Sequence, residues 1–279
     1  MDFSEIISKR VVYALPGMEQ SQVRPNITYK SVGGADLCLD AYYPPGFTFI
    51  GKLPAVLFIH GDGPAGLIKD AKDWGQYISW GQLAAASGLV GIPFSHRSTS
   101  GRLSGMDVVA SDVHDLIEYV RAHADELNVA PDSLCIWACS AGVPYLQELM
   151  AAPPAYIRCM VAYYGMMDFR QFSDSIPSET AAEERATTIR LFKKFSLIDH
   201  LLDHPSAIQP LFVAQAGLDD PGANASIDRF YSEACSLGVK VELVRHLSGH
   251  HGFDILDDDD TSREIIGRTL NFMQTHLRC

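Results

Sequence analysis

The chain has 279 residues, of which 47% are hydrophobic and 20% charged, and it contains no low-complexity tract. This length fits one large α/β domain spanning residues 1–279, because no internal repeat or flexible linker divides the chain. The formal charge of -12 argues against nucleic acid or an anionic membrane surface as a partner, since phosphate binding needs clustered lysine and arginine.

Short apolar runs alternate with amphipathic stretches along the chain. The expected strands are, in order, residues 27–29, 37–42, 55–59, 89–94, 134–137, 159–164, 211–214 and 239–244. Helices are expected over residues 107–127 and 143–150, and two more carry their apolar faces within residues 77–84 and 227–234; a last helix opens at a capping box over residues 261–264. Strands that alternate with helices predict an α/β fold with a mainly parallel, doubly wound sheet flanked by helices.

One segment breaks this alternation. Residues 168–210 are aromatic and charged, with helical stretches but no convincing strand. We interpret this segment as an inserted helical cap, and we expect it to act as a lid over the site.

Ser140 stands at the centre of a pattern typical of a nucleophile elbow. It follows the apolar run 134–137 and opens the helix-compatible stretch 143–150, so that strand, sharp turn and helix come in the required order. Ala138 and Gly142 are small, as the close approach of strand and helix requires. An alcohol is a poor nucleophile at neutral pH, so Ser140 also needs a base and an acid that orients the base.

An acid and a base follow Ser140 along the chain. Asp219 comes just after the strand expected at 211–214, and the neighbouring Asp220 is the alternative acid. His251 comes after the next strand and is preferred to His250, which stands beside it. The carboxyl ends of parallel strands meet at one edge of a sheet, so these side chains are expected to converge on Ser140.

A glycine-rich turn supplies a second requirement of acyl chemistry. Residues 60–63 read His-Gly-Asp-Gly and follow the strand expected at 55–59. Backbone N–H groups of such a turn can face the carbonyl oxygen of a substrate, together with the N–H of Ala141, the residue after the serine.

With these motifs in order, the chain resembles an α/β-hydrolase, near the dienelactone-hydrolase-like and hormone-sensitive-lipase-like esterases. The resemblance covers nearly everything from about residue 30 to the end, and it rests on residues 60–63, the serine elbow, residues 216–219 and residues 251–253. It implies a triad of Ser140, Asp219 and His251. It also implies that the oxyanion donors are Asp62, Gly63 and Ala141.

The chain departs from that family pattern at three positions. Ala138 replaces the glycine that usually opens the elbow, and Asp62 takes third place in a turn that usually reads His-Gly-Gly-Gly. A carboxylate there would oppose the developing oxyanion unless it points away. Dienelactone hydrolases use a cysteine nucleophile, whereas Ser140 holds that place here and Cys139 should face the sheet.

Apolar residues in and beside the insertion predict a substrate pocket. The candidates are Met166, Met167 and Phe169, and their apolar neighbours are Phe172, Phe192 and Phe195. Anchoring the insertion to the body is an equally good interpretation of these residues. Arg97 and Arg102 are candidates to bind a substrate carboxylate, although a solvated position suits each of them better.

The predicted reaction is hydrolysis of small or medium carboxylic esters through an acyl-enzyme, with no metal or organic cofactor. The alternatives are a peptidase or amidase, an acyltransferase or lyase, and a ligand-binding relative without turnover. The six scattered cysteines, an N-terminus without a signal-peptide pattern and the lack of an apolar run of membrane-spanning length favour a cytoplasmic protein with reduced thiols. The sequence leaves a homo-oligomer open.

Overall fold

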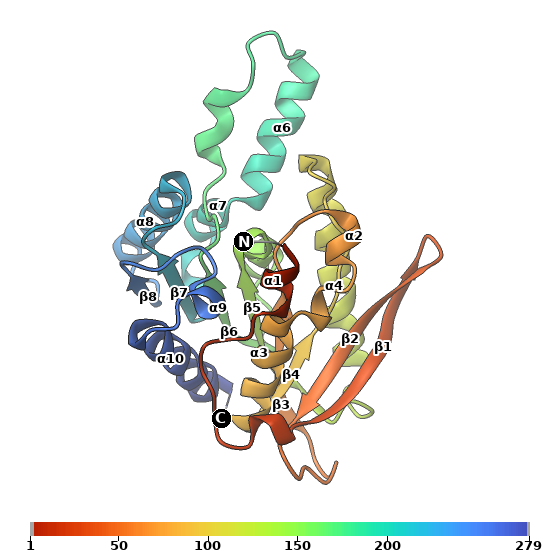
Figure 1. Cartoon of the computed structure of the whole chain (residues 1–279). Coiled ribbons are helices and arrows are strands. Elements are labelled where there is room, and N and C mark those ends of the chain that lie inside the picture. Colours follow the sequence, from red (N-terminus) through yellow and green to blue (C-terminus); the bar gives the residue numbers. More distant parts are fainter. Residues whose placement is uncertain (1–2, 278–279) are drawn as a thin grey trace.

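The structure is a computed structural model, and it describes residues 3–277. Within that range an eight-stranded sheet has the order β1-β2-β4-β3-β5-β6-β7-β8 (Figure 1). Its strands are β1 (Gln22–Val32), β2 (Ala35–Tyr43), β3 (Leu53–Ile59), β4 (Val90–Pro93), β5 (Val129–Cys139), β6 (Ile157–Tyr163), β7 (Leu211–Ala216) and β8 (Val241–His246). The pairs β1–β2 and β2–β4 are antiparallel and the other pairs are parallel, which confirms the predicted α/β class.

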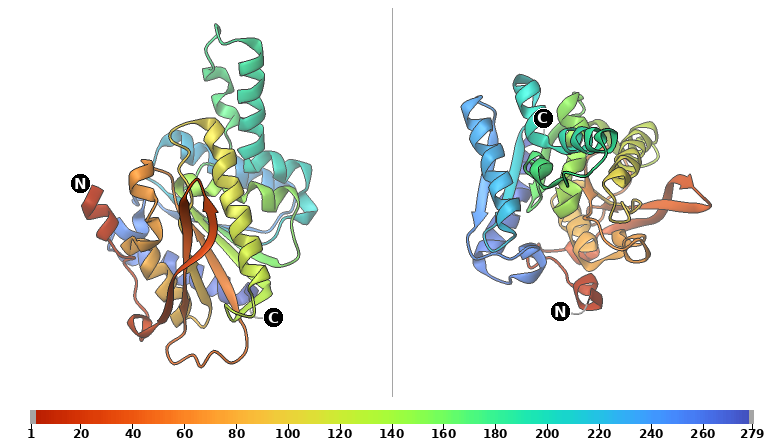
Figure 2. Two further views of the ribbon diagram at one scale, coloured as in Figure 1. Left: turned by 90° about the vertical axis from the view of Figure 1, so that its right-hand side faces the viewer. Right: turned by 90° about the horizontal axis from the view of Figure 1, so that it is seen from above.

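Helices cover both faces of this sheet (Figure 2). They are α1 (Phe3–Ser8), α2 (Ala65–Ile68), α3 (Gly75–Ala86), α4 (Met106–Ala122), α5 (Gln147–Ala151), α6 (Ala182–Phe195), α7 (Leu197–Asp203), α8 (Pro221–Ser236), α9 (Phe253–Leu256) and α10 (Asp260–Leu277). The 3-10 segments are η1 (Met18–Gln20), η2 (Ala71–Asp73), η3 (Leu103–Gly105), η4 (Ser140–Leu146), η5 (Arg170–Ser175) and η6 (Pro205–Ala207). Buried side chains of α4, α5, α7 and α8 form one core, and those of α3 and α10 form the other.

The two-residue period of a strand divides the apolar run of β3 between these cores. Ala55, Leu57 and Ile59 belong to the core under α4, whereas Val56 and Phe58 belong to the core under α3. All five are essentially without solvent exposure. A strand in the middle of a covered sheet therefore reads as a continuous apolar run rather than as an alternating one.

Two helix starts differ from the sequence-based expectation. The stretch after Ser140 begins as the 3-10 segment η4 and becomes α-helical only at Gln147, because Pro144 within it has no N–H for a helical hydrogen bond. The last helix begins at Asp260, and the backbone N–H of Ser262 donates to Asp259 Oδ1 at 2.8 Å. Asp259 therefore caps this helix in place of the predicted box over residues 261–264.

The segment between β6 and β7 consists of η5, α6, α7 and η6, and it contains no strand among its described residues. From the body of the molecule α6 rises beyond the carboxyl edge of the sheet (Figures 1 and 2). At its base Leu191 and Phe195 are buried, and Lys194 Nζ pairs with Asp107 of α4 at 2.5 Å. The outer turns of α6 are mostly exposed.

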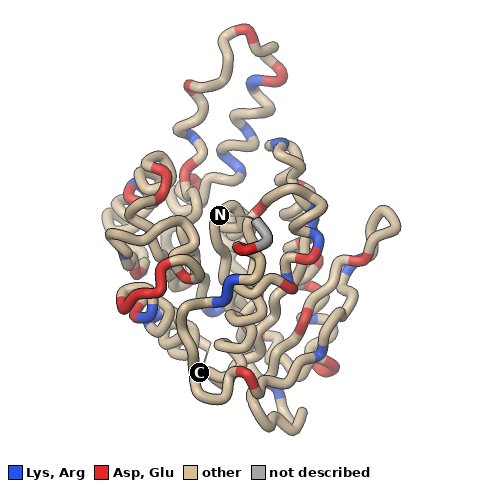
Figure 3. Tube along the Cα trace, in the orientation of Figure 1, with Lys and Arg blue, Asp and Glu red and all other residues tan. Residues whose placement is uncertain are grey.

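Lysine and arginine are dispersed among acidic residues along the chain, and the acidic run at 257–260 lies close to α10 (Figure 3). No helix within residues 3–277 is both long and apolar enough to cross a membrane. The five cysteines in this range are free thiols, whereas Cys279 lies outside it.

Candidate active site

Ser140 sits in a strained turn between β5 and η4. Its φ of 52° lies in the left-handed region, which a residue with a side chain rarely adopts. Two residues later, a Cβ on Gly142 would lie only 2.6 Å from the carbonyl oxygen of His60 in the adjacent chain segment. The turn can therefore close only with glycine at position 142, and it directs the serine hydroxyl above the carboxyl end of the sheet.

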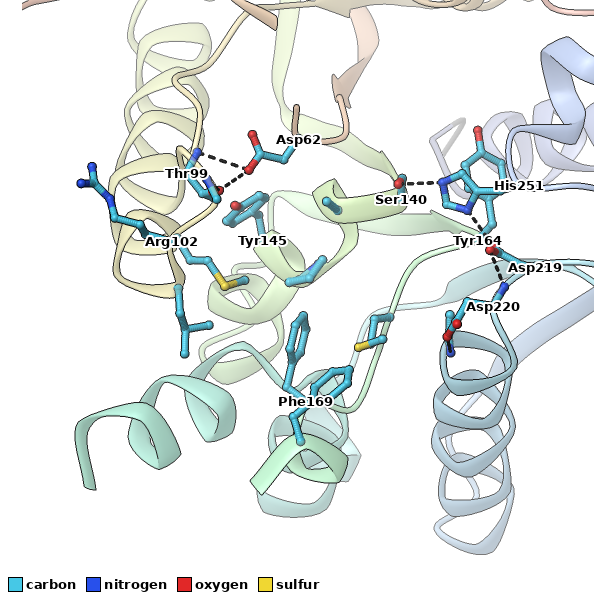
Figure 4. A pocket seen from close by; sticks show the side chains of 18 residues that line it. Asp62, Thr99, Arg102, Ser140, Tyr145, Tyr164, Phe169, Asp219, Asp220 and His251 are labelled. Atoms are coloured by element: carbon cyan, nitrogen blue, oxygen red, sulfur yellow. Dashed lines mark hydrogen bonds and ion pairs between the residues drawn. The ribbon is translucent and has the colours of Figure 1, made fainter. Parts of the chain in front are cut away.

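Three side chains from distant parts of the chain meet at this turn (Figure 4). Ser140 Oγ lies 2.8 Å from His251 Nε2, and His251 Nδ1 lies 2.7 Å from Asp219 Oδ2. An ionised carboxylate only accepts hydrogen bonds, so Nδ1 carries the proton of a neutral His251 and Nε2 presents its lone pair to the serine. This is the geometry that a serine nucleophile with an oriented general base requires.

The structure also distinguishes Asp219 from the neighbouring Asp220. Asp220 Oδ1 accepts from the N–H groups of Gly222 and Ala223, at 2.9 and 3.0 Å, and so caps α8. Its own N–H donates to Asp219 Oδ1 at 2.7 Å, which holds that carboxylate in place. Asp219, and not Asp220, is therefore the acid that contacts His251.

His250 is turned away from the serine. Its backbone N–H and its Nδ1 lie 2.7 and 2.9 Å from the two carboxylate oxygens of Asp257. Gly252, with a φ of 82°, then reverses the chain into α9. The side chain of Phe253 is fully buried at the start of that helix, so the loop that carries His251 is anchored in the core.

A buried carboxylate supports the same loop, and sequence reasoning missed it. Asp254 Oδ2 accepts from Gln76 Nε2 and Trp80 Nε1, both at 2.9 Å, while its Oδ1 accepts from the Tyr164 hydroxyl at 2.7 Å. Burial raises the pKa of Asp254 above its usual value. The ring of Tyr164 lies 4.8 Å from the ring of His251, so Asp254 fixes an aromatic wall beside the imidazole.

The turn at residues 60–63 packs against the serine. A Cβ on Gly61 would lie 3.3 Å from Ser140 Cβ, so the two segments are in close contact. Ala141 is the second residue of η4. Its N–H is therefore one of the first N–H groups of that segment, which have no acceptor carbonyl within it. Among the described residues, the Asp62 N–H has no hydrogen-bond acceptor either.

Gly63 differs from the expectation. Its N–H donates to Oδ1 of Asp62 at 2.8 Å, so this group is occupied rather than open to a substrate oxygen. The reason is local: the side chain of an aspartate can reach the backbone N–H of the following residues and form a turn of its own. The glycine usual at this place in the family turn has no such side chain.

Two histidines without an assigned role in the sequence analysis hold the same turn. The rings of His60 and His96 stack at 3.5 Å, and both side chains are buried. His60 Nδ1 lies 2.6 Å from the Gly61 carbonyl, and its Nε2 accepts from the His96 N–H at 3.2 Å. Burial, together with the neighbouring His96, lowers the pKa of His60. Neutral His60 therefore ties the end of β3 to the chain that follows β4.

A cavity of about 550 Å³ opens beside Ser140. Met166 and Phe169 line it, as expected, and so do Phe172 and Tyr145. Met167 does not: its side chain is fully buried in the core under α4. Met166 therefore faces the cavity, while Met167 faces the core.

The remaining candidates near the cavity are divided between core and surface. Phe195 is buried in the core, and Phe192 packs behind the pocket wall against Phe169, with 6.5 Å between ring centroids. Arg97 is bound to Asp112, with Nη2 at 2.7 Å from Oδ1, and does not line the cavity. Arg102 does line it, at the end far from His251 (Figure 4).

Cys139 is buried beneath the serine, with 2% of its surface exposed, and its Sγ lies 3.3 Å from the Tyr77 hydroxyl. Burial raises the pKa of this thiol to about 12, so it is protonated at neutral pH. Within residues 3–277 no three or more histidine, cysteine, aspartate or glutamate side chains are grouped so as to hold a metal ion.

The sheet order and the serine turn define an α/β-hydrolase fold, and solved structures agree with this. The esterase Est2 from the planctomycete Thermogutta terrifontis, described as thermophilic, matches with a TM-score of 0.69 at 18% identity, covering 93% of this chain and 94% of that one. Its propionate-bound form gives 0.68 at the same identity and coverage, and its apo form 0.65 at 20% identity. At these identities the likeness concerns the fold.

The model of the BD-FAE family matches residues 39–200, which is more than half of the chain. The chain therefore belongs to the BD-FAE family, a family of the α/β-hydrolase type. A search of curated protein sequences finds no significant match.

Proposed function

We propose that this protein is a serine hydrolase of carboxylic esters, with Ser140 as nucleophile, His251 as general base and Asp219 as the acid that orients it. One observation carries the proposal: the hydrogen-bonded series from Ser140 Oγ to His251 Nε2 and from His251 Nδ1 to Asp219. A serine in a strained turn, a base within reach and an acid behind the base are what acyl transfer to serine requires.

In the first step Ser140 Oγ attacks the ester carbonyl while His251 takes the hydroxyl proton. The imidazolium that forms lies against Asp219, whose negative charge stabilises it. His251 then gives the proton to the leaving alcohol, and an acyl-enzyme remains on Ser140. Water activated by His251 cleaves this intermediate and releases the carboxylic acid.

The oxyanion of the tetrahedral intermediate needs preorganised donors. The N–H groups of Ala141 and Asp62 serve this role in our proposal. Ala141 directly follows Ser140, Asp62 directly follows Gly61, which packs against Ser140, and neither N–H has an acceptor within the described chain. Gly63, implied by the family resemblance, is replaced in this role while its N–H is bound to the Asp62 side chain. Loss of one such donor typically costs about 3 kcal/mol in the barrier.

The cavity supports small or medium esters as the proposed substrate class. A volume of about 550 Å³ with an apolar wall of Met166, Phe169 and Phe172 suits an ester with a small or medium acyl group. We infer that residues 168–210 form a cap, since Phe169 and Phe172 line the cavity and α6 stands beyond the sheet edge. The similar Thermogutta terrifontis esterase 2 is described as phosphorylated by paraoxon, and reaction with such a compound is typical of an activated serine.

The direct test is a panel of p-nitrophenyl esters of increasing acyl length, measured on the wild-type protein and on Ser140→Ala. We expect hydrolysis by the wild type, with a preference for short to medium chains, and none by the variant at unchanged thermal stability. His250→Ala is the matched control for His251→Ala, because His250 binds Asp257 instead of the serine. Ester hydrolysis by Ser140→Ala at the wild-type rate would disprove the proposal.

Matched anilides address the amidase alternative. We expect the ratio of kcat/KM for ester over anilide to exceed about 10³, because an amine is a poorer leaving group than p-nitrophenolate and the proposed mechanism assigns only His251 to protonate it. Comparable turnover of the two would indicate a peptidase or amidase on the same triad.

A further inference from the structure

The side chain of Asp62 joins two loops at the wall of the cavity. It belongs to the turn after β3, whereas its partners Ser98 and Thr99 belong to the loop after β4. The Thr99 N–H donates to Asp62 Oδ2 at 3.3 Å, and the Thr99 hydroxyl donates to the same oxygen in a short hydrogen bond. Oδ1 accepts from the Gly63 N–H at 2.8 Å.

Ser98 completes the junction. Its Oγ lies 3.1 Å from Asp62 Oδ1 and 2.8 Å from the Gly63 carbonyl oxygen, so its one proton is shared between two atoms of the same turn. Ser98 Oγ also accepts a hydrogen bond from the Ser100 N–H at 2.9 Å, and this bond orients the hydroxyl so that its proton points toward the 60–63 turn. Thr99 Oγ1 likewise accepts from the Gly101 N–H at 3.2 Å.

Within residues 3–277, every polar contact of the Asp62 carboxylate is therefore a hydrogen-bond donor, and an ionised carboxylate can accept from all of them. Figure 4 shows the carboxylate facing Thr99 and lying away from Ser140. Its negative charge is bound by donors of the neighbouring loop and not aimed at the place where the oxyanion forms. These donors and the orientation of the carboxylate reduce the electrostatic objection to an acid in this turn.

We propose that the Asp62 side chain is a positioning residue of this site: it clamps the 60–63 turn to the 98–101 loop and so holds its own backbone N–H on the oxyanion. The proposal rests on the ester-hydrolase function above. In this arrangement the Gly63 N–H is no longer available to the oxyanion, but the backbone N–H of Asp62 is held in a fixed position. A small displacement of reacting groups can cost about 100-fold in rate, so the clamp should affect the chemical step.

The test measures kcat, KM and inhibition by a trifluoromethyl ketone, whose adduct with the serine carries an oxyanion. For Asp62→Ala we expect kcat to fall roughly 10- to 100-fold with KM within about threefold, and ketone affinity to fall by the same factor as kcat. Asp62→Asn should lose less, since its side-chain oxygen still accepts from the Gly63 N–H. Ser98→Ala, which removes one donor outside the turn, should lie between wild type and Asp62→Ala.

Asp70→Asn is the control for charge, because Asp70 is an exposed acid close to the turn in sequence. Titration of the serine with a fluorophosphonate counts folded sites, so that kcat is expressed per competent molecule. A kcat of Asp62→Ala within threefold of wild type would overturn the proposal. So would a loss of kcat at unchanged ketone affinity, since a clamp on the oxyanion turn must affect both.

Failure of the proposed function itself would look different. The wild-type protein would then hydrolyse no ester, whereas the labelling rate of Ser140 by the fluorophosphonate would still compare wild type with Asp62→Ala. Labelling passes through the same oxyanion pocket, so slower labelling of the variant supports the clamp and equal labelling refutes it.

Discussion

Replacement of Asp219 and Asp220 one at a time should separate catalysis from stability. In Asp219→Asn the acceptor for His251 Nδ1, now at 2.7 Å, becomes a neutral amide, so neither the tautomer nor the imidazolium is stabilised. Loss of the corresponding acid in a serine triad lowers kcat by about 10⁴-fold. In Asp220→Ala two capping hydrogen bonds of α8, at 2.9 and 3.0 Å, are lost, which costs about 1 kcal/mol of folding free energy.

The assay pairs turnover of one p-nitrophenyl ester with urea denaturation of each variant. We expect Asp219→Asn to lose kcat while the free energy of unfolding stays near that of the wild type. Asp220→Ala should show the reverse, and Asp220→Asn should change neither, because asparagine caps helices as well as aspartate does. A kcat of Asp219→Asn within tenfold of wild type, or a comparable loss in Asp220→Asn, would refute the assignment of the acid.

Three further outcomes follow from burial and close contact. Gly142→Ala should abolish ester hydrolysis and lower the melting temperature, because its Cβ would lie 2.6 Å from the His60 carbonyl oxygen; a variant with normal activity would contradict this. Cys139, with a pKa near 12 through burial, should resist alkylation at pH 8 that modifies the exposed Cys235, as mass spectrometry would show. Burial lowers the pKa of His60 and His96, so the unfolded chain binds protons that the folded chain excludes; the free energy of unfolding should fall from pH 6.5 to pH 5.5 in urea titrations.

The strands, the serine turn and the order of the candidate acid and base could be predicted because each shows as a pattern in a short stretch of sequence. The apolar runs at 55–59 and 134–137 form the adjacent parallel strands β3 and β5. The turn at 60–63 and Ser140, which follow these strands, therefore lie at the same carboxyl edge of the sheet. The small residues that flank Ser140 indicate a tight turn because they stand between an apolar run and a helix-compatible stretch. The order of acid and base after the serine needs only the rule that parallel strands end together.

Side-chain direction could not be predicted in the same way. Met166 and Met167 have the same chemistry and adjacent positions, yet only Met166 lines the cavity. No periodicity exists in the irregular connection after β6 to assign them to opposite sides. Gly63 shows the same difficulty, because the partner of its N–H is a side chain whose rotamer depends on the loop at 98–99.

The supporting residues were missed for a different reason: their partners are remote in the sequence. Asp254 is 178 residues from Gln76 and 174 from Trp80, so nothing near residue 254 indicates that α3 will supply its hydrogen bonds. His60 and His96 are separated by 36 residues and meet only because β3 and β4 are neighbours. The proposed nucleophile, base and acid can thus be nominated from motifs, whereas the residues that hold them in position are defined by contacts between elements. This difference explains why Asp62, an apparent fault in the oxyanion turn, is understood only once the loop after β4 is placed against it.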